Sequence, residues 1–305
     1  MFNKICDFFT NLLLLWVLLL SFLGFIKPGY LIILKPYLDY LFMFTMLGIG
    51  FVLNYEDFIP VLKKPHLVIL GTLAQFLIMP FLGWFFAILL KLPKELAVGL
   101  ILTGSAPGAM ASNVISYLAN ADVAYSIALT TTSTFFAPVL TPAFTSFYAK
   151  AFIDIKFLPM FLSIIKMVIL PLLLGFIIKH YMREKIEKIK SFFPAFSTLF
   201  IAFICGLVVA LNKNYLEKVN VIIFVAVALH NFFGLLLGYL FGILYGFDKK
   251  RKRTLSLEVG MQNAGLGAVL ALKHISAQAA LPNALFAVWC ILTATILAQI
   301  WHKNQ

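Results

Sequence analysis

Residues Thr254–Ala271 read TLSLEVGMQNAGLGAVLA, an apolar stretch with a single carboxylate, Glu258, inside it. Gln262 and Asn263 follow closely, and Gly265 and Gly267 come next. The other carboxylates of the sequence can be assigned to membrane surfaces, but this one cannot. A charged side chain at bilayer depth costs at least a few kcal/mol, so it is retained mainly where it faces a polar cavity, a partner or an ion. Glu258 is therefore the first candidate functional residue.

The composition indicates a polytopic membrane protein. Of the 305 residues, 62% are hydrophobic and 12% are charged, whereas soluble domains carry roughly 25% charged residues. The formal charge of +12 is a common sign of nucleic-acid binding. Here the basic residues form short clusters between apolar runs, so topology and contact with anionic lipid explain them better, and no nucleic-acid partner is expected. Cys6, Cys205 and Cys290 are far apart, which predicts neither a disulfide framework nor a zinc site.

The sequence contains ten apolar runs that are long enough to cross about 30 Å of hydrocarbon. They fall near residues 8–26, 37–53, 66–90, 95–119, 123–149, 157–180, 193–211, 219–246, 252–273 and 279–301. The first run resembles a signal peptide but lacks the usual small-residue cleavage site, so we predict a retained helix. Lys and Arg are more frequent in the loops that are cytoplasmic when the N-terminus is inside, such as 179–190 and 249–253. Both termini are therefore expected in the cytoplasm.

An internal repeat suggests how these runs are arranged. A shift of 155 positions places FLGWFFAILL (81–90) on LLGYLFGILY (236–245) and pairs the first five runs with the last five. Because five is odd, the two halves would have opposite orientations, as in inverted-repeat transporters. The shift also pairs the two least helix-like runs, which contain LTGSAPGAMASNV (102–114) and the glycines after Glu258. Breaks in such runs must face protein, water or ions, so we predict an all-α protein of ten transmembrane helices in two inverted five-helix repeats, with helices four and nine broken.

Polar side chains in five runs are candidates for one central site. They are Gln75, Ser112 with Asn113, Ser126 with Thr130, His230 with Asn231, and the stretch Glu258–Asn263. Ser126 and Thr130 share a helix face, although a single buried hydroxyl is more often structural, and His230 and Asn231 are better explained as interhelical hydrogen-bonding partners. Hydroxyl, amide, carbonyl and carboxylate oxygens suit a hard cation, and one negative charge balances a monovalent ion. We infer Na⁺, with H⁺ as the alternative because burial favours the neutral form of a carboxyl group.

Three strings carry a resemblance to a known family. PGAMASNV (107–114), STFFAPVLTPAF (133–144) and EVGMQNAGLG (258–267) occur in this order, and the third is the most specific. Over essentially its whole length the sequence resembles bacterial members of the bile acid:sodium symporter family. The resemblance implies one multi-pass transporter domain (1–305) in the inner (cytoplasmic) membrane, in which broken segments four and nine cross. It also implies a panel at about 8–53 and 157–211, and a core at about 66–149 and 219–301.

The resemblance further implies two co-transported Na⁺ ions near Glu258. The first ion would be held by Ser112, Asn113, Ser126, Thr130 and Glu258, and the second by Gln75 and Glu258 with Val259, Met261 and Gln262, partly through backbone oxygen. Substrate would meet Asn263 and the residues Gly108, Ala109 and Met110. Many bacterial relatives read PGGTASN where this chain reads PGAMASN, so Met110 replaces a small hydroxyl residue and makes the pocket bulkier and less polar.

The implied function is sodium-coupled symport of an organic anion, such as a bile-acid-like compound, pantoate or a keto acid, by alternating access. A proton-coupled or uncoupled organic-anion carrier resembling auxin-efflux proteins is the alternative. An enzyme is not indicated, because the sequence has no HExxH or GxSxG motif and no carboxylate pair at membrane depth. A receptor or scaffold that does not transport would be recognised by a lack of Na⁺ binding. The identity of the anion and the oligomeric state stay open, with a monomer as one option.

Overall fold

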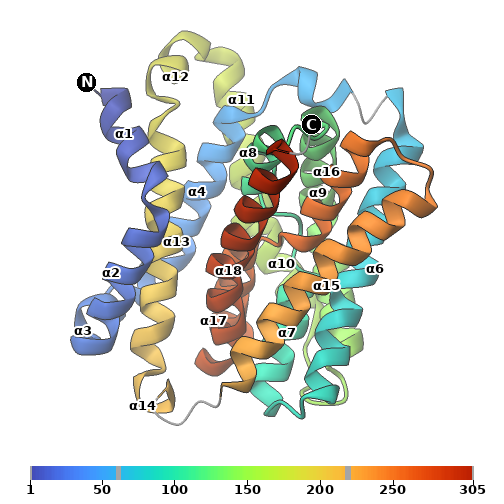
Figure 1. The fold of residues 1–305 in the computed structure, drawn as a ribbon. Helices are drawn as coiled ribbons and strands as arrows, with labels where there is room; N and C mark the ends of the chain where they lie inside the picture. The colour runs from blue at the N-terminus through green and yellow to red at the C-terminus, as the bar shows by residue number, and fades with distance from the viewer. Residues whose placement is uncertain (1, 60–62, 217–220, 304–305) are drawn as a thin grey trace. The chain divides into compact units, whose positions relative to one another are not determined.

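The computed structural model describes residues 2–59, 63–216 and 221–303, and all regular secondary structure in these ranges is helical (Figure 1). The first half contains α1 (Phe2–Asn11), α2 (Leu13–Ile26), α3 (Gly29–Ile32), η1 (Lys35–Tyr37), α4 (Leu38–Val52), η2 (Tyr55–Phe58), α6 (Pro65–Leu89), α7 (Lys94–Ser105), α8 (Ala111–Leu118) and α9 (Val123–Ala149). The second half contains α10 (Phe157–Ile164), the π-helical turn η3 (Ile165–Ile169), α11 (Leu170–Tyr181), α12 (Arg183–Ile189), α13 (Phe192–Leu211), α14 (Lys213–Leu216), α15 (Ile222–Leu244), α16 (Lys249–Gly260), α17 (Ala264–His274) and α18 (Ala277–Lys303).

Seven helical stretches in the described ranges are long and apolar enough to cross a membrane. They are Gly29–Val52, Pro65–Leu89, Val123–Ala149, Phe157–Tyr181, Phe192–Leu211, Ile222–Leu244 and Ala277–Lys303. The pair Lys4–Thr10 and Leu13–Ile26 passes the same test together but is bent by 64°. The runs predicted at 95–119 and 252–273 are absent from this set because each is divided into two shorter helices. The prediction of an all-helical polytopic membrane protein is therefore confirmed, while the ten-helix inverted repeat stays a prediction.

The chain divides into two compact units, and the first comprises Met1–Asn54 and Leu162–Val219. In this unit α2 packs along α13, and α4 packs along α11. Glycines allow the backbones to approach at both contacts, since Gly24 faces the backbone of Gly206 and a Cβ on Gly50 would lie 3.0 Å from the Cα of Gly175. Membrane helices commonly use small residues in this way, because no hydrophobic force drives them together in lipid.

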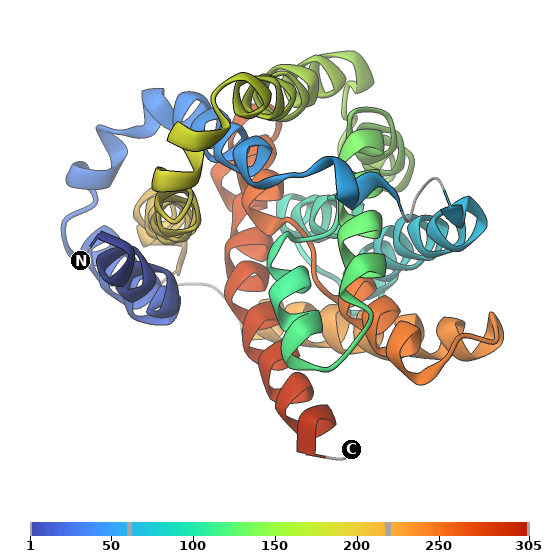
Figure 2. The same cartoon turned by 90° about the horizontal axis from the view of Figure 1, so that it is seen from above.

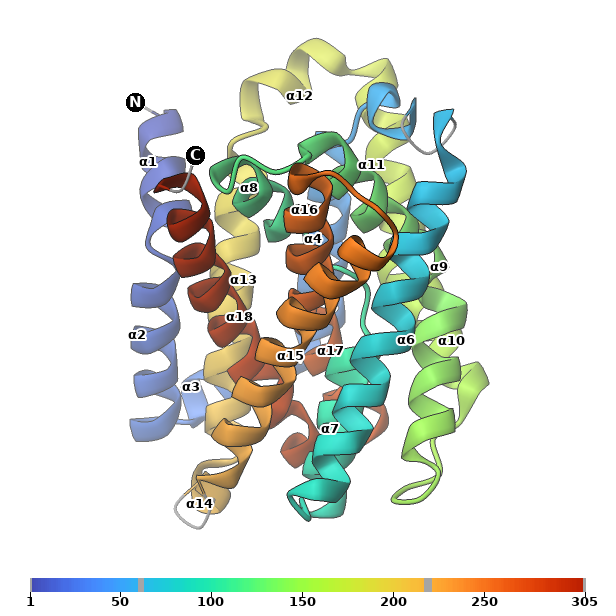
Figure 3. The same cartoon turned by 45° about the vertical axis from the view of Figure 1, so that its right-hand side comes forward.

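The second unit comprises Tyr55–Phe161 and Asn220–Gln305. In it α6 packs on α7, α9 and α15, and α15 packs on α16. Figure 3 shows α16 next to α8 and α9, and Figure 2 shows α8 alongside α18. Every residue in 96–105, 253–260 and 264–271 is buried. The half-helices α7, α16 and α17 therefore form the centre of this unit.

The two interrupted helices meet at their breaks. Pro107 lies in the break between α7 and α8, where it cannot supply a helical N–H. Gly108 and Gln262 form an isolated antiparallel bridge. Next to it the Ala109 N–H donates to the Met261 carbonyl at 3.1 Å, and the Asn263 N–H donates to the Pro107 carbonyl at 2.8 Å. Backbone groups that leave the helical pattern therefore satisfy one another, as apolar surroundings demand.

Candidate cation site

Glu258 lies in the last turn of α16, and its side chain is 1% exposed. Its Oε1 atom accepts hydrogen bonds from Ser112 Oγ and Ser126 Oγ, both at 2.5 Å, and its Oε2 atom accepts one from Thr130 Oγ1 at 2.9 Å. Ser112 comes from α8, while Ser126 and Thr130 are one turn apart on α9. Two helices, α8 and α9, thus bring three hydroxyls to one carboxylate on α16.

Asn113 completes this cluster. Its Oδ1 atom lies 2.9 Å from Ser126 Oγ and 3.3 Å from Thr130 Oγ1, so it competes with Glu258 for the protons of these two hydroxyls. All five residues predicted for the first ion, Ser112, Asn113, Ser126, Thr130 and Glu258, are therefore joined in one hydrogen-bonded group, which we call the Glu258 cluster.

The oxygens of the Glu258 cluster outnumber the protons available between them. Each hydroxyl carries one proton, yet Ser126 Oγ lies within bonding distance of both Glu258 and Asn113. Thr130 Oγ1 is near Glu258, near Asn113 and 3.0 Å from the Ser126 carbonyl. Several of these oxygen–oxygen contacts therefore hold no proton. A hard cation would attract all these oxygens at once, so the cluster is chemically suited to one.

The charge of Glu258 has no cationic side chain beside it in the part of the chain that the structure describes. The ion pairs found there involve Glu187, Asp122 and Asp248. Removing a carboxylate from water costs several kcal/mol unless an opposite charge or strong hydrogen bonds compensate. A single monovalent cation would supply the missing charge, and neutral oxygens would supply the rest of its coordination.

The residues predicted for the second ion are buried in the same region but bond mainly to one another. Gln75 Nε2 donates to Gln262 Oε1 at 3.3 Å, and Gln262 Nε2 donates to the Val259 carbonyl at 2.9 Å. The Met261 carbonyl accepts the Ala109 N–H across the breaks. These contacts place the four predicted residues side by side, without a direct hydrogen bond to Glu258.

Gly108 lies where the two predicted sets come together. A Cβ added to Gly108 would lie 3.0 Å from Glu258 Oε2, 3.5 Å from Ser133 Oγ and 3.6 Å from Gln75 Oε1. Three oxygens from three different helices therefore converge on a space that the glycine leaves open. This convergence suits a second cation held by Gln75 and Glu258.

The residues predicted to meet substrate lie in or next to the breaks. Ala109, Met110 and Asn263 are partly exposed, whereas Gly108 is buried. The Oδ1 atom of Asn263 accepts from the Leu266 N–H at 3.1 Å and so caps the start of α17. Asn263 thus has a structural bond of its own besides any contact it makes with a substrate.

Two hydroxyls of this region, those of Ser116 and Ser133, were not predicted from the sequence. Ser116 Oγ donates to Ser126 Oγ at 3.2 Å, and Ser133 Oγ accepts from the Gly108 N–H at 3.2 Å. A signal was present for both. Ser116 follows Ser112 by four positions, and Ser133 follows Thr130 by three, so each shares a helix face with a predicted residue.

His230 and Asn231 act as links between helices, as the sequence predicted. His230 Nε2 bonds to the Met79 carbonyl at 2.9 Å, and Asn231 Nδ2 donates to the Gly260 carbonyl at 2.8 Å. Asn231 Oδ1 accepts in turn from Thr293 Oγ1 at 2.7 Å. The His230 bond joins α15 to α6, and the Asn231 bonds fix the end of α16 against α15 and α18.

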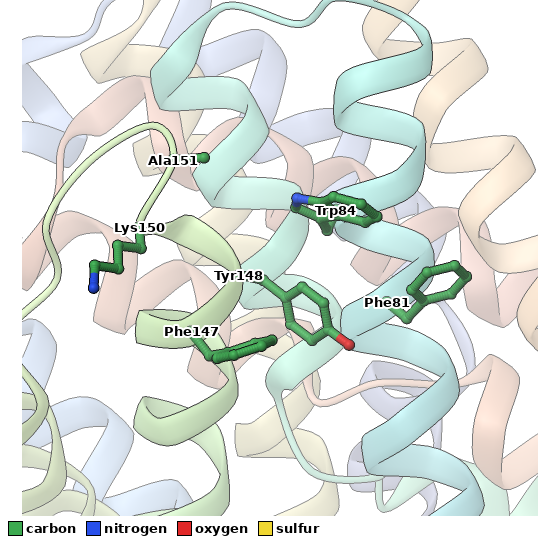
Figure 4. A pocket seen from close by; sticks show the side chains of 6 residues that line it. All are labelled: Phe81, Trp84, Phe147, Tyr148, Lys150 and Ala151. Atoms are coloured by element: carbon green, nitrogen blue, oxygen red, sulfur yellow. The ribbon is translucent and has the colours of Figure 1, made fainter.

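A hollow of about 640 Å³ lies elsewhere in this unit, at the far end of α6 and α9 (Figure 4). It is lined by Phe81, Trp84, Phe147, Tyr148, Lys150 and Ala151, and the Lys150 side chain points away from the rings. Tyr148 is 18 positions after Thr130, which corresponds to roughly 27 Å of helix. Trp, Tyr and Lys together are typical of a membrane–water boundary, so we assign this hollow no part in cation binding.

An all-helical membrane protein whose two interrupted helices meet beside a buried carboxylate has the architecture of a secondary transporter. Comparison with known proteins places it more narrowly. Residues 40–219 match the model of the Sodium Bile acid symporter family, and the chain belongs to this family. Members of this family are transporters and not enzymes, as the names of the relatives described next indicate.

The similarity to individual relatives extends over nearly the whole chain. The sodium-dependent transporter YocS of Bacillus subtilis is 38% identical over 302 residues, which cover 99% of this chain and 94% of that protein. The probable sodium/metabolite cotransporter BASS1 of Arabidopsis thaliana chloroplasts is 34% identical, covering 95% of this chain and 73% of that protein. The rice chloroplast protein BASS2, with the same description, is 34% identical and covers 99% and 73%.

Proposed function

We propose that the protein is a sodium-coupled symporter of an organic anion that works by alternating access, with two Na⁺ ions bound near Glu258. The observation that carries this proposal is the Glu258 cluster, in which a buried carboxylate lies among neutral oxygens and has no cationic side chain beside it among the described residues. The names of the relatives, a sodium-dependent transporter and sodium/metabolite cotransporters, support the same ion.

In this proposal the first Na⁺ neutralises Glu258 and draws α8, α9 and α16 together through Ser112, Ser126 and Thr130. The second Na⁺ lies near Gly108 and is held by Gln75, Glu258 and Gln262 with backbone oxygens of Val259 and Met261. Because Ala109 and Met261 are hydrogen-bonded across the breaks, ion binding also stabilises the crossing of the two interrupted helices. The symport follows because the anion site is completed only when the ions are bound.

The organic anion is proposed to bind at the breaks themselves. Both α8 and α17 begin there, at Ala111 and Ala264, and the N-terminus of a helix carries a partial positive charge that favours an anion. Ala109, Met110 and Asn263 are the partly exposed residues of this place. Met110 makes it less polar than a Thr would, so an anion with an apolar body is favoured.

We assign the panel to 8–53 and 157–211 and the core to 66–149 and 219–301.

The decisive experiment is uptake by the purified protein in liposomes. Labelled organic acids of graded size are offered under an inward Na⁺ gradient, and then with choline replacing Na⁺. We expect uptake of at least one acid with Na⁺ and none with choline. Uptake that a proton gradient drives in choline would overturn the proposal and establish the proton-coupled alternative, and equal uptake without any ion gradient would establish an uncoupled carrier.

A further inference from the structure

Helices α9 and α16 are joined by two polar contacts that lie one helical turn apart. The nearer contact is the bond between Ser126 and Glu258 in the cation site. At the second contact Thr254 Oγ1 accepts from the Asp122 N–H at 2.9 Å and donates to the Asp122 carbonyl at 3.0 Å. Asp122 precedes Ser126 by four positions and Thr254 precedes Glu258 by four, so both contacts lie on the same two helix faces.

Thr254 is well suited to fix the register of these two helices. It is fully buried, with 0% of its surface exposed. Its hydroxyl donates to and accepts from the backbone of a single residue, the N-cap Asp122 of α9, and a sliding movement along the helix axis would break both bonds. The Asp122 carboxylate is also fixed, because its Oδ1 atom accepts the Tyr125 N–H at 3.1 Å and caps α9.

The loop that connects α8 to α9, residues 119–122, is held at further points. Arg253 Nη1 donates to the Ala119 carbonyl at 2.9 Å, and the Arg253 guanidinium lies 5.6 Å from the centre of the Trp301 ring. Arg253 is only 4% exposed. Arg251 Nε pairs with Asp122 Oδ2 at 3.3 Å. Arg251 and Arg253 of α16 therefore hold the loop 119–122 in place. The helices on either side of this loop, α8 and α9, carry the other residues of the Glu258 cluster.

We propose that Thr254 is a positioning residue of the cation site: its bonds to the Asp122 backbone hold α9 in register with α16 and thereby set Na⁺ affinity. This inference rests on the proposed function. The reason is geometric, because Ser126 and Thr130 reach the Glu258 carboxylate only when the two helices keep their present offset. Groups that orient metal ligands from outside the coordination shell typically change metal affinity by about 10–100-fold when removed.

The test compares three substitutions of Thr254 in the full-length protein. Thr254→Ser keeps the hydroxyl, Thr254→Cys keeps a weak donor, and Thr254→Val keeps the shape but removes the hydrogen bonds. The dissociation constant for ²²Na⁺ is measured on purified protein, together with the Na⁺-induced rise in melting temperature, which reports the same affinity by linkage. Lys250→Gln, an exposed position on α16, is the control.

We expect Thr254→Ser and Lys250→Gln to bind Na⁺ within about twofold of the original protein, and Thr254→Val to bind at least about tenfold more weakly. The Na⁺ affinity of Thr254→Cys should lie between those of Thr254→Ser and Thr254→Val. If Thr254→Val does not fold, the comparison of Thr254→Cys with Thr254→Ser decides the test. A melting temperature lowered equally in Na⁺ and in choline, with unchanged Na⁺ affinity, would show a merely structural role and overturn the inference. Absence of Na⁺ binding in the original protein would instead overturn the proposed function, and the inference with it.

Discussion

At the scale of single residues, the burial of the Glu258 carboxylate is the feature that most needs a compensating interaction. Its carboxylate is 1% exposed and bonded to three hydroxyls. Glu258→Gln keeps the size of the side chain but removes the charge that a cation needs. We expect expression to persist and Na⁺-driven uptake to fall at least about 100-fold, equivalent to about 2.7 kcal/mol.

The measurement for Glu258→Gln is uptake in proteoliposomes as a function of Na⁺ concentration. Glu95→Gln is the matched control, because Glu95 is exposed in the first turn of α7, and it should transport normally. Undiminished Na⁺-driven uptake by Glu258→Gln would falsify the assignment of this carboxylate to the ion.

The hydroxyl of Ser126 has a smaller role that can be measured separately. It lies 2.5 Å from Glu258 Oε1 and 2.9 Å from Asn113 Oδ1. Ser126→Ala leaves both oxygens short of a partner, and losing a hydrogen bond to a buried group costs about 1–3 kcal/mol. We expect the Na⁺ concentration for half-maximal uptake to rise roughly 10-fold or more. Thr132→Ala, at a partly exposed position on the same helix, should leave that concentration unchanged.

At the scale of elements, we expect the break between α7 and α8 to leave space for a second ion only because residue 108 is glycine. An alanine methyl there would lie 3.0 Å from Glu258 Oε2 and 3.6 Å from Gln75 Oε1. We expect Gly108→Ala to lower the Hill coefficient for Na⁺ from near two towards one. Gly265→Ala is the control, since among the described residues its methyl would meet Asn263 Oδ1 alone, at an ordinary contact distance of 3.6 Å. A Hill coefficient near two in Gly108→Ala would place the second ion elsewhere.

The positions of the two breaks could be predicted from the sequence, but the contacts between them could not. Gly104, Pro107 and Gly260 marked the interruptions because such residues weaken helices locally, and the structure has a break at each predicted place. The bonds between the breaks were not predictable, since the Ala109 and Met261 pairing joins segments far apart in the chain. Ser133 was missed although it shares a helix face with Thr130. Thr254 was missed because its partner is the backbone of Asp122, far away in the sequence, and such a contact leaves no mark on sequence periodicity.

At the scale of the whole molecule, the distribution of basic residues predicts the orientation in the membrane. Loops such as 179–190 should be cytoplasmic. Single cysteines at Lys188 and Lys94, both exposed, can be tested in a variant that lacks Cys6, Cys205 and Cys290. A membrane-impermeant maleimide should label Lys94→Cys in intact cells and Lys188→Cys only after permeabilisation. The reverse pattern would invert the topology and place both termini outside.

The number of ions per anion has an electrical consequence for the whole transport cycle. Two Na⁺ ions moving with one monovalent anion carry one net positive charge, and each such charge gains about 2.3 kcal/mol per 100 mV of membrane potential. Accumulation of the anion should therefore rise about tenfold for every 60 mV of inside-negative potential. A potassium gradient with valinomycin sets the potential in proteoliposomes, and the steady-state ratio of internal to external anion is measured. Gly108→Ala, reduced to one Na⁺ per anion, should become insensitive to the potential, and equal voltage dependence in both proteins would contradict the two-ion assignment.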